Sequence, residues 1–315
     1  MGTYLVKRLL LMLLTLVGIS MLIFVLLWLM PGNIAVIMFD TAGFIDPEEM
    51  AAIEKELGLD LAIPLQYFHW IGGLLTWDLG LSFVSEMPVV DELAPRIPIT
   101  AKLAALAIGY SILFGLPLGV ISAVRQNTAL DYTLRVISLS GLSLPSFWLA
   151  LLILMFFVQV FGTIPVYLEP PENLWDELLL YAIPAAVAGF RASALIMRLT
   201  RSAMLEVMRQ DYIRTARAKG VSDGAVNYRH ALKNAMLPVT TVIGIEAAFM
   251  MGGLVVIETV FNIPGMAYFL VEAILVRDYP MVQNLVMLMA VIPVSLNFIV
   301  DMIYALLDPR IRYAE

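Results

Sequence analysis

The chain has 315 residues, of which 61% are hydrophobic and only 14% charged, with a mean hydropathy of +0.89 and a formal net charge of −7. Soluble domains are about half apolar and about a quarter charged, so this composition excludes an ordinary soluble protein and predicts an integral membrane protein. With no cysteine and only two histidines, the sequence excludes disulfides, thiolate zinc sites, cysteine nucleophiles and histidine-rich metal sites.

Six stretches are long and apolar enough to cross a bilayer, which takes about 20 residues of helix. Each must be helical in hydrocarbon, because any other open segment leaves backbone polar groups unpaired. The expected spans are Leu9–Met30, Leu103–Val124, Val136–Val160, Leu178–Leu199, Val239–Val260 and Leu285–Leu307. We expect the first span to be retained, because it is too long for a signal sequence and no small-residue cleavage site follows it.

The segment 31–98, between the first and second spans, is long enough to have a structure of its own. Asp46 as N-cap, with proline next and acids in the first turn, predicts the start of a helix that ends at Gly58. The following stretch, Pro64–Leu81, contains tyrosine and tryptophan, which favour the headgroup level of a membrane. We therefore expect a structured external segment whose aromatic part lies along the outer surface.

Arg191 falls inside the fourth expected span and Glu246 inside the fifth. Charges in a membrane are costly and therefore point to function, here a water-filled path that contacts substrate. The favoured alternative is an ion pair, or long side chains that reach for the interface and orient the helices. Prolines that interrupt the spans are candidate hinges, although proline is common in membrane helices; they are Pro117, Pro145, Pro184 and Pro293.

The cytoplasmic segment Thr200–Leu237 carries an amphipathic pattern in which apolar residues recur every four positions from Met204 to Ala216. Gly220 follows a basic last turn, so it is expected at the C′ position that ends this helix. Ser222 is expected to cap a second short helix that runs up to Pro238, where the fifth span starts. A helix, a glycine break and a helix fit either a basic element on the inner leaflet or a docking element for a cytoplasmic partner.

The basic residues decide the orientation, because cytoplasmic loops collect lysine and arginine. With both termini in the cytoplasm, the outside keeps only Lys55, Arg96, Lys102 and Arg277. The inside then holds Lys7, Arg8, Arg125, Arg135, Arg198, Arg201, Arg209, Arg214, Arg217, Lys219, Arg229, Lys233, Arg310 and Arg312. The sequence thus predicts an N-in, C-in topology. Its acidic residues gather outside, where they suit either a basic partner or a salty or acidic habitat.

The sequence gives little support to an enzyme. It contains no G-x-x-x-x-G-K-[ST] phosphate loop, so the chain cannot hydrolyse ATP by that route. It also contains no G-x-S-x-G and no H-E-x-x-H motif. We therefore expect no catalytic residues and no metal site in this chain.

Tyr212–Gly220 followed by Arg229–Pro238 resembles the EAA loop of binding-protein-dependent ABC permeases, in the form found in the dipeptide, oligopeptide and nickel importer subfamily. The resemblance covers nearly the whole chain and is specific to the B-type of the two permeases. It also includes Tyr4–Asn33, Glu56–Asp60, Pro64–Gly80, Gly141–Trp148, Glu258–Phe261, Pro264–Gly265, Arg277–Pro280 and Leu307–Arg310. One departure is that Arg214-Thr215-Ala216 stands where Glu-Ala-Ala would fall, so a salt bridge of that glutamate cannot be transferred.

The resemblance implies a type I ABC importer permease fold in a multi-pass protein of the cell inner membrane. The chain would then divide into residues 1–30 with the first span, the external segment 31–98 and a permease core 99–315 that includes the loop 200–238. Implied partners are a second homologous permease, two ATPase subunits that bind ATP and Mg²⁺, an extracytoplasmic substrate-binding protein and the lipid bilayer, with no nucleic acid and no cofactor in this chain. The residues expected to couple to an ATPase are Arg214, Thr215, Ala216, Lys219 and Gly220.

The implied substrates are di- and oligopeptides, because most of the subfamily carries peptides; nickel complexes and oligosaccharides remain open. One rival interpretation is an ion-driven secondary transporter with Arg191 and Glu246 as the relay. Such folds are usually built from inverted repeats, and none is visible in the sequence. The other rival is a structural or lipid-interacting membrane subunit with no transport role.

Overall fold

A computed structural model of the protein describes residues 2–29 and 60–307, and these residues fold almost entirely into helices. The helix predicted between Asp46 and Gly58 lies outside the described residues. In chain order the elements are α1 (Gly2–Trp28), α4 (Ile63–Thr76), α5 (Val89–Leu93), α6 (Arg96–Val124), α7 (Ala129–Ser143), α8 (Ser146–Phe161), α9 (Leu174–Val207), α10 (Asp211–Ala218), α11 (Asp223–Ala225), the π-helix η1 (Val226–Leu232), α12 (Lys233–Val260), α13 (Met266–Leu275) and α14 (Tyr279–Leu307).

Five stretches of helix within the described residues are long and apolar enough to cross a membrane. They are Tyr4–Trp28, Val89–Val124, Leu174–Val207, Asp223–Val260 and Tyr279–Met302. The helices α7 and α8 pass the same test only as a pair, and the pair bends by 108° at its break. Counted as one broken span, this pair brings the number to six, so the prediction of an all-α membrane protein with about six spans is confirmed.

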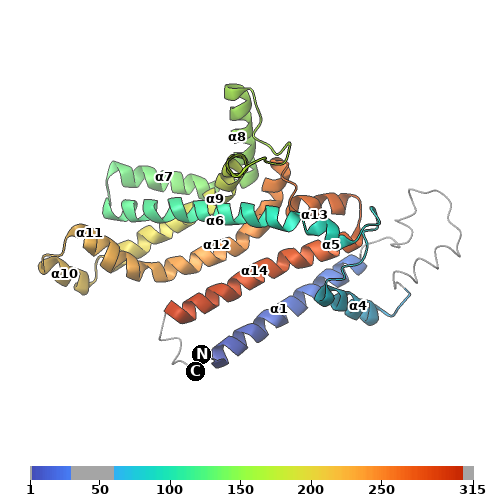
Figure 1. Ribbon diagram of the computed structural model, residues 1–315. Coiled ribbons are helices and arrows are strands. Elements are labelled where there is room, and N and C mark those ends of the chain that lie inside the picture. Colours follow the sequence, from blue (N-terminus) through green and yellow to red (C-terminus); the bar gives the residue numbers. More distant parts are fainter. Residues whose placement is uncertain (1, 30–59, 308–315) are drawn as a thin grey trace.

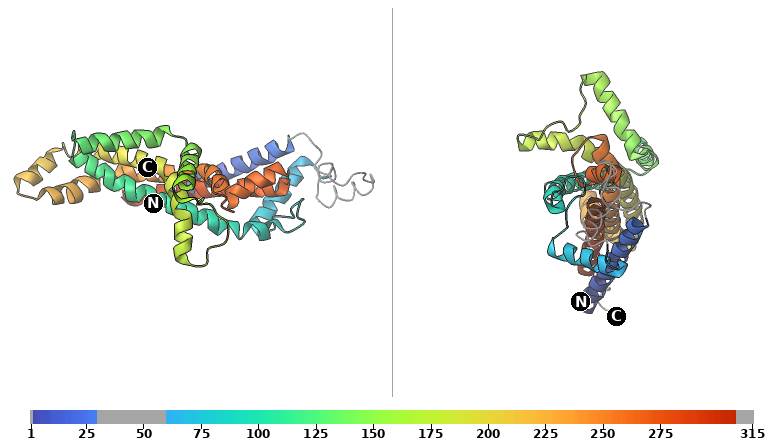
Figure 2. Two further views of the ribbon diagram at one scale, coloured as in Figure 1. Left: turned by 90° about the horizontal axis from the view of Figure 1, so that it is seen from above. Right: turned by 90° about the vertical axis from the view of Figure 1, so that its right-hand side faces the viewer.

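The third predicted span, Val136–Val160, is wrong as a single continuous helix. α7 ends at Ser143 and α8 begins at Ser146, and Leu144 between them is extended, with φ −83° and ψ 127°. Pro145 explains the break, because proline disfavours helical backbone at the preceding residue and donates no N–H. Figures 1 and 2 show α7 along the long axis of the molecule and α8 standing away from it. The other three prolines lie inside helices: Pro117, Pro184 and Pro293.

The centre of the molecule is formed by α6, α9 and α12, and α6 and α9 lie side by side along much of their length (Figure 1). Glycines permit their close approach. A Cβ atom on Gly115 would lie 2.7 Å from the carbonyl oxygen of Ser193, and one on Gly189 would lie 2.5 Å from that of Ala107. Small residues of this kind let membrane helices pack backbone against backbone. The two helices therefore form one tightly packed unit.

The first and last helices run antiparallel beside each other at the edge of the molecule (Figure 1). The guanidinium of Arg8 near the start of α1 lies 2.8 Å from a carboxylate oxygen of Asp301 near the end of α14. Toward its other end, α1 packs on α4, where the hydroxyls of Ser20 and Tyr67 are 2.8 Å apart and Phe24 contacts the Tyr67 ring edge to face. The outward face of α1 is largely exposed and apolar, as expected of a surface that meets lipid.

The described part of the external segment is tied to the start of α14 by two buried polar residues. Asp278 accepts a hydrogen bond from the hydroxyl of Ser82 and a longer one of 3.3 Å from the N–H of Phe83. The side chain of Asn284 donates to the carbonyl of Leu79 at 3.0 Å and accepts from the indole N–H of Trp70 at 3.1 Å. These bonds hold the segment after α4 against the bundle, so this described part of the segment is structured as predicted, while its external position stays a prediction.

Candidate functional site

The end of the molecule opposite α4 and α13 is formed by the connection from α9 through α10 and α11 to η1 (Figure 1). Ile213 fixes α10 there, because its side chain is fully buried in an apolar cluster with Met204, Val226 and Ala231. The side-chain amide of Asn234 adds a 2.7 Å hydrogen bond to the hydroxyl of Tyr212. The short helix is thus held from one side and presents its other side to solvent.

Gly220 ends α10 in the way predicted for the C′ position. Its φ is +81°, in the left-handed region that glycine adopts without strain. Its N–H donates to the carbonyl of Arg217 at 2.9 Å, and the N–H of Val221 donates to the carbonyl of Ala216 at 3.2 Å. These two bonds form a Schellman motif. Nothing lies within 4 Å of a Cβ added at Gly220, so the backbone conformation and not a lack of space selects glycine.

The residues predicted to couple to a partner lie together on this surface. Four of them are exposed and Ala216 is half-buried; the exposed ones are Arg214, Thr215, Lys219 and Gly220. Arg214 lies 3.4 Å from Asp211 and Arg217 lies 3.7 Å from Asp223, but these are exposed pairs of little energetic weight. The positive charges therefore remain accessible to a docking partner.

Two details of this connection differ from the sequence predictions. The single helix expected across Met204–Ala216 is broken between α9 and α10, where Gln210 is extended with ψ 149°; the break lets Ile213 turn into the apolar cluster. The second helix does not stop before Pro238. Helix continues from Asp223 through the π-helix into α12, and Pro238 lies inside α12, where a single missing N–H is tolerated in a packed membrane helix.

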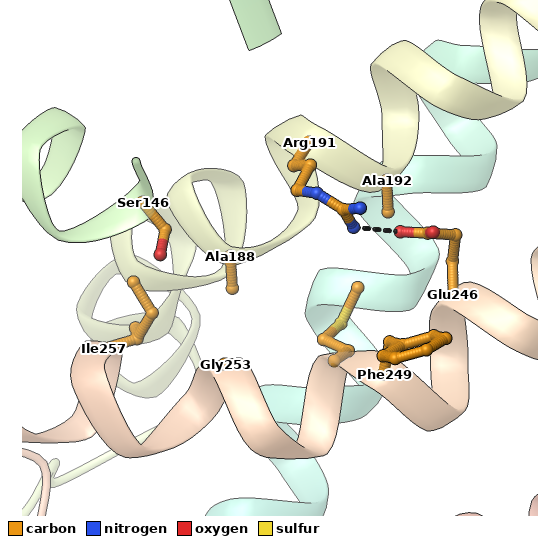
Figure 3. Close-up of a pocket in the computed structure, with 9 residues that line it drawn as sticks. Ser146, Ala188, Arg191, Ala192, Glu246, Phe249, Gly253 and Ile257 are labelled. Atoms are coloured by element: carbon orange, nitrogen blue, oxygen red, sulfur yellow. Dashed lines mark hydrogen bonds and ion pairs between the residues drawn. The ribbon is translucent and has the colours of Figure 1, made fainter. Parts of the chain in front are cut away.

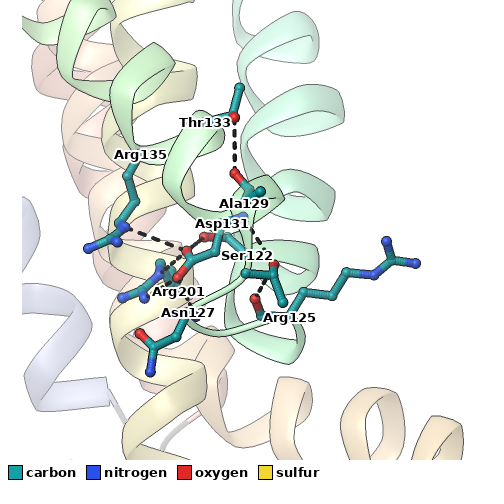
Figure 4. A network of polar contacts seen from close by, with 9 residues as sticks. Ser122, Arg125, Asn127, Ala129, Asp131, Thr133, Arg135 and Arg201 are labelled. Carbon is teal, nitrogen blue, oxygen red and sulfur yellow. Dashed lines mark hydrogen bonds and ion pairs between the residues drawn. The ribbon is translucent and has the colours of Figure 1, made fainter.

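A buried ion-pair network lies just above this end, where the α6–α7 turn meets α9 (Figure 4). Asp131 is fully buried, and its carboxylate accepts two 2.8 Å hydrogen bonds from the guanidinium of Arg201, one on each oxygen. The hydroxyl of Ser122 donates to it at 2.6 Å and the N–H of Asn127 at 3.0 Å. A bidentate pair with both carboxylate oxygens satisfied offsets the cost of burying the charges, so the loss of one partner would leave the other uncompensated.

Sequence reasoning missed this network. The pattern Thr128-Ala-Leu-Asp131 marks a helix start, because a threonine N-cap followed three residues later by an acid is a capping signal. Thr128 does accept a hydrogen bond from the N–H of Asp131 at 3.4 Å. Arg201, however, follows 70 residues later, and no local pattern links the two.

Arg191 and Glu246, the two charged residues singled out in the predicted spans, meet in a cavity between α9 and α12 (Figure 3). Arg191 donates one 2.8 Å hydrogen bond from its Nη1 atom to Glu246. The Glu246 side chain is 7% exposed, whereas that of Arg191 is 56% exposed. The rest of the cavity is mainly apolar and includes the first residue of α8; its lining residues are Ser146, Ala188, Ala192, Phe249, Met250, Gly253 and Ile257.

Another buried carboxylate, that of Glu258, lies near the C-terminal end of α12. Glu258 is fully buried, accepts a 2.7 Å hydrogen bond from the hydroxyl of Thr100 and accepts a 2.8 Å bond from the N–H of Tyr268. It thereby caps the start of α13 from another helix, as an acid does at the positive end of a helix. A Cβ on Gly265 would lie 2.5 Å from the Glu258 carboxylate carbon, so a larger residue there would displace the carboxylate from its present position.

The two predicted sets of site residues are not brought together. The coupling residues lie at one end of the molecule, while Arg191 and Glu246 lie near the middle of the long helices α9 and α12. Both helices, however, lead into the connection that carries α10, which gives a continuous physical link between the two places. Within residues 2–29 and 60–307, no group of three or more His, Asp or Glu side chains is placed to hold a metal ion.

Comparison with known proteins adds a consistent set of relatives. Residues 115–313 match the family model described as binding-protein-dependent transport system inner membrane component, and residues 1–104 match the model of its N-terminal region. The chain is 37% identical to the dipeptide transport system permease protein DppB of Alkalihalophilus pseudofirmus, over 99% of this chain and 100% of the relative. It is 37% identical to DppB of Escherichia coli K12, over 99% of each chain. It is 36% identical to the glutathione transport system permease protein GsiC of Pectobacterium atrosepticum, over 99% of this chain and 100% of the relative.

Proposed function

The chain belongs to the binding-protein-dependent transport system inner membrane components, and from that membership we propose that it forms half of the translocation pathway of an ATP-driven importer of short peptides. The dipeptide and glutathione permeases among its relatives support a peptide as the substrate. A second, homologous permease would complete the pathway, two cytoplasmic ATPases would hydrolyse ATP, and an external binding protein would deliver the peptide.

The observation that carries the proposal is the exposed, basic α10 with its Schellman end at Gly220. A short rigid helix, fixed from one side and open on the other, is suited to enter a cleft of an ATPase. Arg214, Thr215 and Lys219 would contact the partner, with Ala216 and Gly220 shaping the surface. Closure of the ATPases on ATP would then displace α10 and, through α9 and α12, the spans that line the pathway.

Arg191 and Glu246 would lie on that pathway. Their cavity lies between the two helices that lead into the α10 connection, so movement of α10 would change the distance between the two side chains. The pair thus gives the pathway a polar point that can respond to the state of the ATPases. This assignment is separate from the docking role, and each is tested on its own.

Gly220→Asp tests the docking role. The substitution puts a side chain at φ +81° and a negative charge on a basic surface, so we expect ATP-dependent uptake to be abolished while the protein remains in the membrane. Uptake is measured in proteoliposomes that contain the complete complex. Gly224→Ala is the matched control: Gly224 is exposed on α11, has no positive φ and has nothing within 4 Å of an added Cβ, so uptake should be unchanged.

Purification from the native membrane distinguishes the proposal from its rivals. Co-elution of two ATPase subunits and a second permease supports the importer, and their loss in the Gly220→Asp variant would place the defect at the docking contact. Full uptake in the absence of any nucleotide-hydrolysing subunit would instead require an ion-driven transporter. Uptake of nickel complexes or oligosaccharides, but not of peptides, would keep the importer and reject its proposed substrate.

A further inference from the structure

Two of the ion pairs that join helices in the described part of the chain differ in how completely they are closed. In the Asp131–Arg201 pair both carboxylate oxygens and two guanidinium nitrogens are engaged, and the arginine side chain is only 16% exposed. In the Arg191–Glu246 pair one nitrogen meets one oxygen, and the arginine side chain is 56% exposed and lines a cavity. The first geometry is that of a structural clamp. The second leaves donors of the guanidinium turned to the cavity.

Within the part of the chain that the structure describes, the bond to Glu246 is the one hydrogen bond made by the Arg191 side chain. A guanidinium has five N–H donors, so it retains most of its capacity for a further acceptor. A carboxylate is the acceptor that matches its planar fork. Glu246 in turn accepts one bond in this arrangement and matches a cationic donor such as an ammonium group.

A ligand with only one of these charges cannot replace the pair without cost. An anion that draws Arg191 away leaves the buried Glu246 carboxylate uncompensated, which is strongly unfavourable. A cation that binds Glu246 releases the more exposed Arg191 guanidinium from its bond, at a smaller cost. A ligand that carries both charges replaces the Arg191–Glu246 pair by two new ion pairs, one with each residue. From this balance we propose that the cavity binds short peptides by their free termini, with Arg191 on the α-carboxylate and Glu246 on the α-ammonium group; the inference rests on the function proposed above.

The rest of the cavity agrees with recognition of the ends and not of particular side chains. Its other walls are mostly apolar or small, with Phe249, Met250 and Ile257 on α12 and alanines on α9. Nothing lies within 4 Å of a Cβ added at Gly253, which also lines the cavity, so space is open on that wall. A site of this kind recognises the α-carboxylate and the α-ammonium group, which all free peptides carry, and tolerates varied residues between them.

Competition binding with trialanine tests the inference. The complex that co-purifies with the chain, without the external binding protein, is placed in nanodiscs and tested with radiolabelled trialanine against its N-acetyl and its C-amide forms. We expect each capped form to bind at least about 10-fold more weakly than trialanine, because each leaves one charge of the pair unmatched. No binding of trialanine, or equal binding of all three forms, would overturn the inference.

Single variants make the assignment specific. Arg191→Gln should lose discrimination against the C-amide and keep it against the N-acetyl form, whereas Glu246→Gln should show the opposite pattern. An equal loss for all three ligands in both variants would show a structural role and contradict the inference. Because each preference is a ratio measured on one preparation, a lower yield of folded complex does not affect it. Lys102→Gln, which breaks the Lys102–Glu177 pair outside the cavity, should keep both preferences.

The outcome is separable from that of the proposed function. ATP-dependent uptake of trialanine by the wild-type complex with its binding protein tests whether the chain serves a peptide importer at all. If uptake occurs but the complex in nanodiscs binds trialanine and its two capped forms equally well, only the site assignment fails. If no peptide is taken up under any condition, the proposed function fails with it.

Discussion

At the scale of single residues, three buried carboxylates fix the junctions between helices. Asp131 accepts the N–H of Asn127 in the α6–α7 turn, Glu258 accepts the N–H of Tyr268 at the start of α13, and Asp278 accepts the N–H of Met281 at the start of α14. Backbone donors at turns and helix starts have no partner within their own helix. An acid from the neighbouring segment satisfies them and sets the angle at which the next helix leaves.

Removal of the Asp131 carboxylate should destabilise the protein more than the loss of any exposed charge. In Asp131→Ala the guanidinium of Arg201, 16% exposed, loses both of its bonds, and a broken buried pair costs about 3 kcal/mol or more of unfolding free energy. The measurement is thermal melting of the purified protein in detergent. The control is Asp211→Asn, which removes the exposed partner of Arg214; its melting temperature should equal that of the wild type. Equal melting of both variants would mean that the network does not hold α7 to α9.

At the scale of elements, the sequence predicted the number and rough positions of the spans, because apolar runs of membrane length leave few alternatives to a helix. From the sequence, Pro145 predicts an interruption of the span but not the angle between α7 and α8, because that angle depends on what α8 packs against. The π-helical turns and the helix running through Pro238 were missed for the same reason: both depend on tertiary packing. The glycine end of α10 was predictable because a Schellman motif is encoded locally. The Asp131–Arg201 pair was not, because its partners are far apart in the chain.

At one point of the contact between α12 and α14, a glycine lies directly against a valine side chain. A Cβ on Gly244 would lie 2.8 Å from Cγ1 of Val300, so Gly244→Ala should lower the melting temperature, with a cost of about 1–3 kcal/mol typical of overpacking. Val300→Ala removes the colliding methyl groups. The double variant should therefore be more stable than the sum of the two single changes predicts. Strict additivity in this double-mutant cycle would show that the two helices do not meet at this point.

At the scale of the whole molecule, charge is distributed along the long axis. The α10 end carries exposed basic side chains, among them Arg209, Arg214, Arg217, Lys219, Arg229 and Lys233. The opposite end carries exposed or half-exposed acids, among them Asp78, Glu86, Asp91 and Glu92. The start of α1 and the end of α14 lie toward the basic end (Figure 1). This arrangement agrees with both termini and the α10 connection on the cytoplasmic side.

Single cysteines test this orientation directly, because the natural chain contains none. Arg209→Cys and Ser85→Cys introduce one exposed thiol at each end. In intact cells, a membrane-impermeant maleimide should label Ser85→Cys and leave Arg209→Cys unlabelled until the membrane is opened. The opposite labelling pattern would invert the topology, and with it the docking role of α10. Uptake by each variant confirms that the labelled protein is assembled.

From Asp223 to Val260 the backbone is helical without a gap, with Glu246 about 35 Å along it from the α10 connection. Two features at which helices commonly bend, the π-helical turns of η1 and Pro238, lie between the α10 connection and Glu246. A displacement of α10 would therefore pass along this helix toward Glu246 through these two points. The π-helical turns of η1 set the direction in which Glu246 faces relative to α10, because one residue more or fewer turns a helix by about 100°. The direction in which Glu246 points relative to α10 therefore depends on the hydrogen-bond register of the seven residues of η1.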